Sequence, residues 1–229
     1  WYGDLVKELK SPLKIDFKNN VSFLTFNYDR SFDQYLFESI KNSYGISSKE
    51  CKSLIEDIPI IHLHGQVGKL AWQGKGEKGR LYDKNFSALS LINDHSAPIN
   101  KYSSYDRDNA VQYIRHEISG QIKIIHENEL DSDSAFKDAQ KLLKEAERVY
   151  FLGFGYNDEN LRRLKIADLT KAVTTEVASG GSSTTTRIVE GTAHGIGTMK
   201  RGQIRSAYKI ELHKQYKVKE FIKEIVDFS

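Results

Sequence analysis

The sequence has one cysteine and one methionine, and it lacks any long apolar run. Cys51 has no partner for an internal disulfide, so we expect a reducing, cytoplasmic location. No apolar stretch approaches the length of a membrane-spanning helix, and WYGDLVKELK resembles neither a signal nor a transit peptide, so we expect no membrane partner. Because Met199 is the only methionine, residues 1–229 are expected to be a fragment of a larger chain.

Strong charge of either sign is also lacking. The formal net charge is +3, with acidic and basic residues mixed along the chain, which argues against a dedicated nucleic-acid-binding protein. The C-terminal part is locally basic, and we interpret it as a solvated face, with nucleic-acid binding as the alternative. Its basic residues are Lys200, Arg201, Arg205, Lys209, Lys214 and Lys217.

Apolar periodicity predicts alternating strands and helices. Apolar, β-rich runs indicate buried strands, and amphipathic spacing or good capping residues indicate helices. The expected strands are 21–26, 58–65, 149–155 and 208–214, and the expected helices are 31–40, 108–118, 134–149, 157–164 and 218–228. This order is typical of an α/β fold, and we expect one Rossmann-like domain over 1–229, a mostly parallel sheet with helices on both faces.

Two regions interrupt this pattern. Residues 66–104 are polar and contain several glycines, which predicts a loop-rich insertion with short helices. Residues 174–186 are rich in Thr, Ser and Gly, which predicts an exposed, flexible loop. The run from there to Gln203 is expected to be hairpin or loop.

Polar residues stand at the carboxyl ends of three expected strands, in 25–29, 62–65 and 153–156. In an open α/β sheet these ends face one crevice, so the three groups are candidates for a common site. Each has a structural alternative. Asn27 or Asp29 could cap the helix that begins near Ser31, which is itself a plausible N-cap.

The histidines and glycines have structural alternatives as well. His64 could be a core histidine. His62, two residues earlier, is expected to be one, held by a backbone carbonyl. Gly153 and Gly155 could simply mark a tight turn after their strand.

Three motifs together resemble the sirtuin-like family, in particular the zinc-free microbial NAD hydrolases that act as effector domains in defence against phages. FLTFNYD resembles the family's strand ending in Asn-x-Asp, IHLHG its strand ending in His-Gly, and YFLGFGYNDEN its glycine-containing nucleotide strand. Their order and spacing also agree, over about residues 21–165. The resemblance implies hydrolysis of NAD to nicotinamide and ADP-ribose.

The resemblance also implies roles for individual residues. Asn27 would position the ribose or the attacking water, and His64 would act as general base on a ribose hydroxyl. Asp29 would hold the nicotinamide carboxamide. The remaining cofactor-binding positions would be Thr25, Phe26, Gly153, Phe154 and Gly155. A homo-oligomer, or contact with other domains of the parent protein, is expected.

The sequence departs from the family pattern in two places. The 20 residues before VSFLTFN contain only Gly3 and no phosphate loop, so the strand that carries this loop is expected to be missing. Cys51 alone cannot supply the four thiolates of the deacylases' structural zinc site, so we expect no zinc. The histidines 95, 116, 126, 194 and 213 show no metal-ligand spacing, and we expect no metal site.

Several functions remain open. NAD hydrolysis or ADP-ribosyl transfer is favoured over protein deacylation because the zinc module is absent. The alternative class is a module that binds ADP-ribose or a related nucleotide without turnover, or that serves oligomerisation. The sequence contains neither a Gly-x-Ser-x-Gly elbow nor a Walker-type loop.

Overall fold

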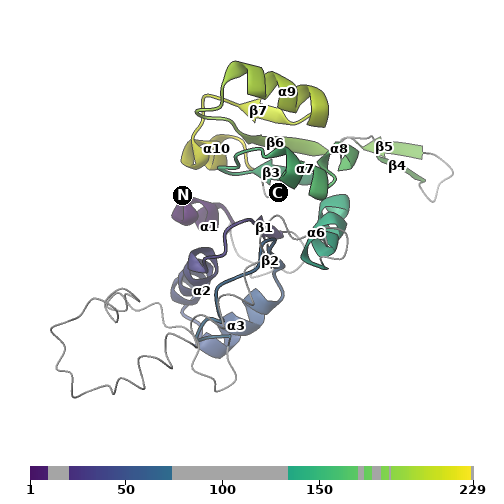
Figure 1. The fold of residues 1–229 in the computed structure, drawn as a ribbon. Coiled ribbons are helices and arrows are strands. Elements are labelled where there is room, and N and C mark those ends of the chain that lie inside the picture. The colour runs from purple at the N-terminus through teal and green to yellow at the C-terminus, as the bar shows by residue number, and fades with distance from the viewer. Residues whose placement is uncertain (10–20, 74–133, 170–172, 177–181, 186, 228–229) are drawn as a thin grey trace, which may run out of the picture. The chain divides into compact units, whose positions relative to one another are not determined.

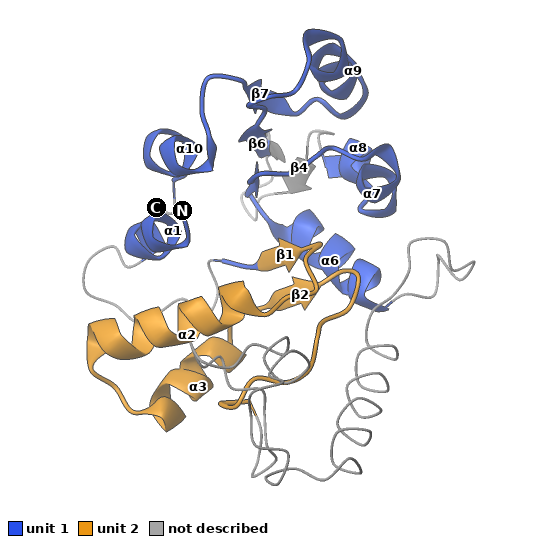
Figure 2. Cartoon of the chain, turned by 60° about the vertical axis from the view of Figure 1, so that its left-hand side comes forward, with its two compact units in different colours: residues 1–22, 129–229 blue, residues 23–128 orange. Residues whose placement is uncertain are grey.

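The computed structural model describes residues 1–9, 21–73, 134–169, 173–176, 182–185 and 187–227 (Figure 1). The expected helix at 108–118 and all of the insertion beyond residue 73 lie outside the described residues. The chain divides into two compact units (Figure 2). Unit 1 comprises 1–22 and 129–229, and unit 2 comprises 23–128.

Unit 2 is built around two parallel strands, β1 (Phe23–Thr25) and β2 (Ile60–His62). Phe23 pairs with Ile60 and Thr25 with His62, so the two strands end at the same level. The chain between them forms α2 (Ser31–Tyr44) and α3 (Ser48–Glu56), which contact each other. Both strands and α2 confirm the sequence prediction, although the strands are shorter than expected.

The described helices of unit 2, α2 and α3, have clear sequence causes. Leu36, Phe37 and Ile40 lie on one buried face of α2. The helix ends at Gly45, whose φ of 61° is left-handed and favours glycine. A capping box starts α3: the Ser47 side chain accepts from the Glu50 amide, and the Glu50 carboxylate accepts from the Ser47 amide.

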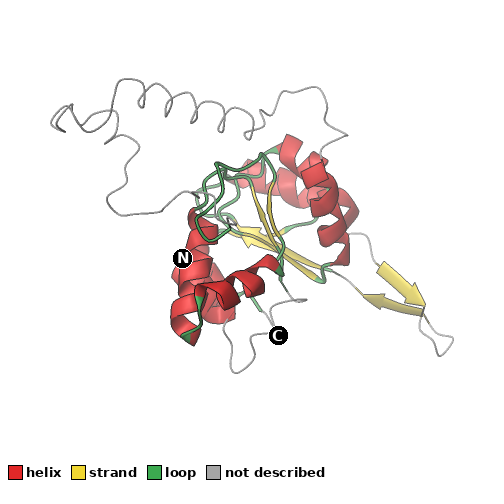
Figure 3. Cartoon of the chain, turned by 90° about the horizontal axis from the view of Figure 1, so that it is seen from below, coloured by secondary structure: helices red, strands yellow, loops and turns green. Residues whose placement is uncertain are grey.

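Unit 1 contains a three-stranded parallel sheet in the order β3-β6-β7. Helices alternate with these strands along the chain. Figure 3 shows the helices in red and the strands in yellow. The strands are β3 (Arg148–Phe151), β6 (Ile188–Thr192) and β7 (Glu211–His213). The helices are α1 (Tyr2–Leu9), α6 (Ser134–Glu145), α7 (Asp158–Arg163), α8 (Ile166–Leu169), α9 (Thr198–Tyr208) and α10 (Val218–Glu224).

The sheet of unit 1 alternates its side chains between two faces. Val149, Val189 and Leu212 are buried on one face. On the other face, Phe221 of α10 packs edge-on against the rings of Tyr150 and His213, at centroid distances of 6.2 and 5.3 Å. Helix α1 contacts α10. Both faces of this small sheet are therefore packed, and the chain has an α/β fold.

The structure corrects the predictions for 174–203. Part of the expected loop forms an antiparallel hairpin of β4 (Val173–Glu176) and β5 (Ser182–Thr185), in which Val173 pairs with Thr185. The run that was expected to be hairpin or loop contains β6 and most of α9. Strand β6 was missed because Glu190 and Gly191 interrupt a run with only two apolar β-branched residues. No described helix is long and apolar enough to cross a membrane.

Candidate functional site

The carboxyl ends of β1 and β2 lie side by side in unit 2 and carry Asn27 and His64. The Leu63 amide donates to the Thr25 carbonyl at 2.8 Å, which continues the strand contact one residue past β2. Just beyond it, the rings of Phe26 and His64 lie 5.3 Å apart between centroids. The structure therefore brings together Thr25, Phe26, Asn27 and His64, as their places after two parallel strands predict.

Asn27 is exposed, and its backbone is held on both sides. Its amide donates to Thr25 Oγ1 at 3.1 Å, and its carbonyl oxygen lies 2.8 Å from His62 Nδ1. Among the described residues, the side-chain amide of Asn27 has no hydrogen-bond partner. A fixed backbone with an uncommitted amide donor and acceptor suits a residue that orients a polar ligand.

His64 is buried, with 5% of its surface exposed. It lies two residues beyond β2, in a turn where Gly65 has a φ of 81° and donates its amide to the His62 carbonyl at 3.1 Å. The expected strand at 58–65 therefore ends at His62, and His64 belongs to the following turn. Its burial leaves only a small part of the imidazole open to a ligand.

His62 is a core histidine bound to a backbone carbonyl, as the sequence predicts. The other side of its ring meets a buried ion pair. His62 Nε2 lies 3.1 Å from Asp33 Oδ2, and Asp33 Oδ1 accepts from the Arg30 guanidinium at 2.8 Å. Arg30 and Asp33 are 2% and 3% exposed. Burial raises the pKa of Asp33, but the hydrogen bonds and charges of His62 and Arg30 outweigh it and leave this pKa below its usual value.

This buried network was not predicted from the sequence. One signal was available: Asp33 lies on the same helical face as Leu36, Phe37 and Ile40, so the apolar stripe of α2 begins with a carboxylate. A charged residue on a core face requires a partner. The partners, Arg30 and His62, could not be assigned without the fold.

Asp29 has the local capping role that is its structural alternative. Its carboxylate accepts from the Ser31 amide at 2.9 Å and also from the Ser31 hydroxyl. Ser31 is the first helical residue and not the N-cap, a position that Arg30 occupies without a side-chain cap. Asp29 thus satisfies an amide at the start of α2, and its contact with nicotinamide stays a prediction.

In unit 1, Gly153 forms a tight turn just after β3. Its φ is 62°, and its amide donates to Thr192 Oγ1 at 2.9 Å. The Phe154 ring lies 5.4 Å from that of Phe151 and 5.2 Å from that of Tyr156. Gly155 is exposed, and its carbonyl accepts from the Lys200 ammonium at 3.0 Å. The turn role of Gly153 is therefore present, beside the end of β6.

The end of β6 is a polar edge that the sequence prediction missed. After Thr192, residues 193–197 lead into α9, whose N-cap Gly197 provides no side-chain cap. The first amides of this helix are thus left without a capping side chain, as in many anion-binding turns. The signal in the sequence was the set of glycines at 191, 195 and 197 ahead of a polar helix.

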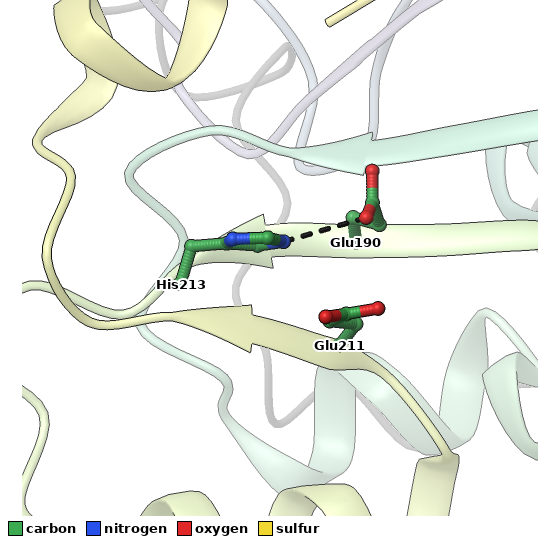
Figure 4. A group of neighbouring side chains, drawn as sticks. All are labelled: Glu190, Glu211 and His213. Atoms are coloured by element: carbon green, nitrogen blue, oxygen red, sulfur yellow. Dashed lines mark hydrogen bonds and ion pairs between the residues drawn. The ribbon is translucent and has the colours of Figure 1, made fainter. Parts of the chain in front are cut away.

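One group of potential metal ligands lies on the sheet of unit 1 (Figure 4). The ligand atoms of Glu190, Glu211 and His213 lie within 4.8 Å of one another. Glu190 and Glu211 also line a cavity of about 530 Å³, but so do Arg148, Arg187 and Lys209, whose charges disfavour a cation. His213 Nε2 lies 3.4 Å from Glu190 Oε1, and this contact explains the position of the imidazole without an ion.

The predicted site residues thus form two sets, each described within its own unit. Thr25, Phe26, Asn27, Asp29 and His64 belong to unit 2. Gly153, Phe154 and Gly155 belong to unit 1. Comparison of the chain with models of protein families, with curated proteins and with solved structures finds no match.

Proposed function

We propose that this chain is a sirtuin-like, Rossmann-like α/β protein that hydrolyses NAD to nicotinamide and ADP-ribose. One observation carries the proposal. Asn27 and His64 lie near each other, just after two parallel strands that end at the same level. An amide and an imidazole at that edge of a parallel sheet occupy the usual place for ligand-binding groups. The biological setting that we propose is an effector domain in antiviral defence.

The chemistry asks for two kinds of group. The bond between nicotinamide and ribose C1′ breaks, nicotinamide leaves with the bonding electron pair, and C1′ gains oxocarbenium character. Water then adds to C1′ and loses a proton, which gives ADP-ribose. In this scheme Asn27 orients the ribose or the water, and His64 draws a proton from a ribose hydroxyl and so stabilises the cationic sugar.

The exposure of the Asn27 side chain supports its proposed role in orienting the ribose or the water. Its side-chain amide is solvent-accessible while its backbone is fixed by Thr25 and His62. Such a residue loses little conformational entropy when it binds a ligand. The contact of Gly153, Phe154 and Gly155 with a nucleotide stays a prediction from the sequence; Gly153 and Gly155 are exposed.

Three variants test the assignment. We expect Asn27→Ala and His64→Asn to lower nicotinamide release at least about a hundredfold, because each removes a group that acts on the sugar in the transition state. Asn42→Ala is the matched control, since Asn42 is an exposed asparagine on α2. Unchanged release in Asn27→Ala or His64→Asn, with the fold intact by circular dichroism, contradicts the catalytic roles of these two residues.

The burial of His64 favours a second function. A base that is 5% exposed is poorly placed to meet a substrate, whereas the exposed Asn27 can still contact a bound nucleotide. The second candidate is therefore a module that binds ADP-ribose or NAD without turnover. Titration calorimetry with NAD and ADP-ribose, together with an assay of nicotinamide release, distinguishes the two functions. Binding of both nucleotides without nicotinamide release over hours supports the binding module and contradicts the hydrolase.

A further inference from the structure

The contact between His62 and Asn27 has a defined direction. His62 is the last residue of β2, opposite Thr25 of β1, and its Nδ1 lies 2.8 Å from the Asn27 carbonyl oxygen. A carbonyl oxygen can only accept, so Nδ1 carries a proton and donates it. The peptide group that joins Asn27 to Tyr28 is thereby fixed by the neighbouring strand.

The second nitrogen of the same ring faces another acceptor. Nε2 lies 3.1 and 3.4 Å from the two carboxylate oxygens of Asp33. Because the pKa of Asp33 is held below its usual value, the carboxylate is ionised at neutral pH and can only accept. Both ring nitrogens of the buried His62 thus face an oxygen acceptor.

Arg30 completes the network and connects it to the next loop. Its guanidinium donates to Asp33 Oδ1 at 2.8 Å, to the Gly68 carbonyl at 3.0 Å and to Gln73 Oε1 at 3.2 Å. The Asp33 carboxylate thus lies between the Arg30 guanidinium and the His62 ring, with 4% of its side chain exposed. Removal of any member leaves a buried charge without its partner, which is costly, so the members hold one another in place.

We propose that His62 is a positioning residue for Asn27, oriented by Asp33 and Arg30. It does not touch the substrate. It fixes the Asn27–Tyr28 peptide, and through it the backbone from which the Asn27 side chain projects. The inference rests on the proposed NAD hydrolysis for its kinetic consequence, while the orientation of the peptide is a property of the protein alone.

Two substitutions distinguish the roles of the two ring nitrogens of His62. In asparagine the amide nitrogen is attached to Cγ, as Nδ1 is, so His62→Asn keeps a donor towards the Asn27 carbonyl. In glutamine the amide nitrogen lies one bond further out, near the place of Nε2, so His62→Gln keeps a donor towards Asp33 only. Asparagine is the smaller residue and leaves the larger cavity, so a purely structural role predicts that His62→Asn is the more damaged variant.

The positioning role predicts the reverse order for turnover. We expect kcat for NAD hydrolysis to fall about tenfold or more in His62→Gln and clearly less in His62→Asn, with KM little changed in both, because a misoriented catalytic group affects mainly the reacting geometry. Equal losses in the two variants, or a larger loss in His62→Asn that follows its lower thermal stability, contradict the positioning role.

A measurement on the unmodified chain keeps this inference separate from the proposed function. In ¹⁵N-labelled protein, we expect Nδ1 of His62 to carry a proton, and we expect the Tyr28 amide resonance to shift in His62→Gln but to stay near its original place in His62→Asn. An unprotonated Nδ1, or a Tyr28 amide that is equally displaced in the two variants, overturns the inference. These results do not depend on whether the chain turns over NAD.

Discussion

The hydroxyl of Tyr156 lies so close to Gly191 that a Cβ at position 191 would collide with the phenol oxygen. The same hydroxyl donates to the Thr192 carbonyl at 3.0 Å. Tyr156 is fully buried and has a φ of 50°, which is uncommon for a residue other than glycine. Tyr156 thus attaches the turn after β3 to the end of β6. Its position leaves no room for a side chain at residue 191.

Gly191→Ala is therefore expected to destabilise the protein. The added methyl group would also meet Phe151, with contacts of 2.8 Å to its Cβ and 3.1 Å to its carbonyl oxygen, so the backbone has to shift. We expect a loss of about 1–3 kcal/mol in the free energy of unfolding, as for other overpacked cores. Urea unfolding followed by circular dichroism measures it.

Gly202→Ala is the control for that substitution. Gly202 is an exposed residue within α9, and a Cβ there meets nothing within 4 Å. Alanine is the better helix former by roughly 0.5–1 kcal/mol, so this variant should be slightly more stable than the parent chain. Equal effects of the two substitutions contradict the close contact between Gly191 and Tyr156.

The Asp33 network predicts sensitivity to acid. The folded pKa of Asp33 lies below its value in the unfolded chain, so the unfolded state takes up the proton first as the pH falls. The stabilising contribution is thus present above about pH 4 and is lost progressively below it, towards the folded pKa. We expect the urea concentration at the midpoint of unfolding to fall progressively as the pH is lowered below about 4.

Asp33→Asn tests whether this carboxylate is responsible. We expect the variant to lose about 3 kcal/mol of stability at pH 7, because Arg30 and His62 stay buried without their counter-ion. It should also show a weaker dependence on acid than the parent chain. Asp138→Asn removes an exposed carboxylate of α6 and serves as the control. A parent-like acid dependence in Asp33→Asn contradicts the account.

Cys51 provides a chemical probe of unit 2. Its side chain is buried, its thiol donates to the Phe37 carbonyl at 3.3 Å, and burial raises the pKa of the thiol above its usual value. Since the thiolate is the reactive form, we expect thiol reagents to modify the native chain at least about a hundredfold more slowly than the unfolded chain. Spectroscopic assay of the single thiol measures both rates. Similar rates would show that α2 and α3 do not cover it.

Much of the fold follows from the sequence, because apolar spacing is strong in most elements. In α6, for example, Phe136, Ala139 and Leu143 recur on one face, and the helix was predicted. In α9 the only buried residue is Ile204, and Gly202 stands near the centre, so no apolar face was visible. Elements that bury little apolar surface give little signal, which explains why this helix was missed.

The candidate site, too, could be predicted only in part from the sequence. The adjacency of Asn27 and His64 could be predicted, because parallel strands put their carboxyl ends on one edge. The burial of His64 could not, since it depends on where β2 ends and how the following turn folds back at Gly65. The contact of Asp33 with His62 could not be predicted either, because it joins residues about thirty positions apart through side chains alone.

The central claim, that the chain hydrolyses NAD, is tested most directly by incubation of the purified chain with NAD and chromatographic quantification of the products. The account predicts nicotinamide and ADP-ribose in equal amounts, rising with time and with protein concentration, and at least about a hundredfold less of both with Asn27→Ala. No nicotinamide from a folded chain that binds NAD, or undiminished release from Asn27→Ala, would contradict it.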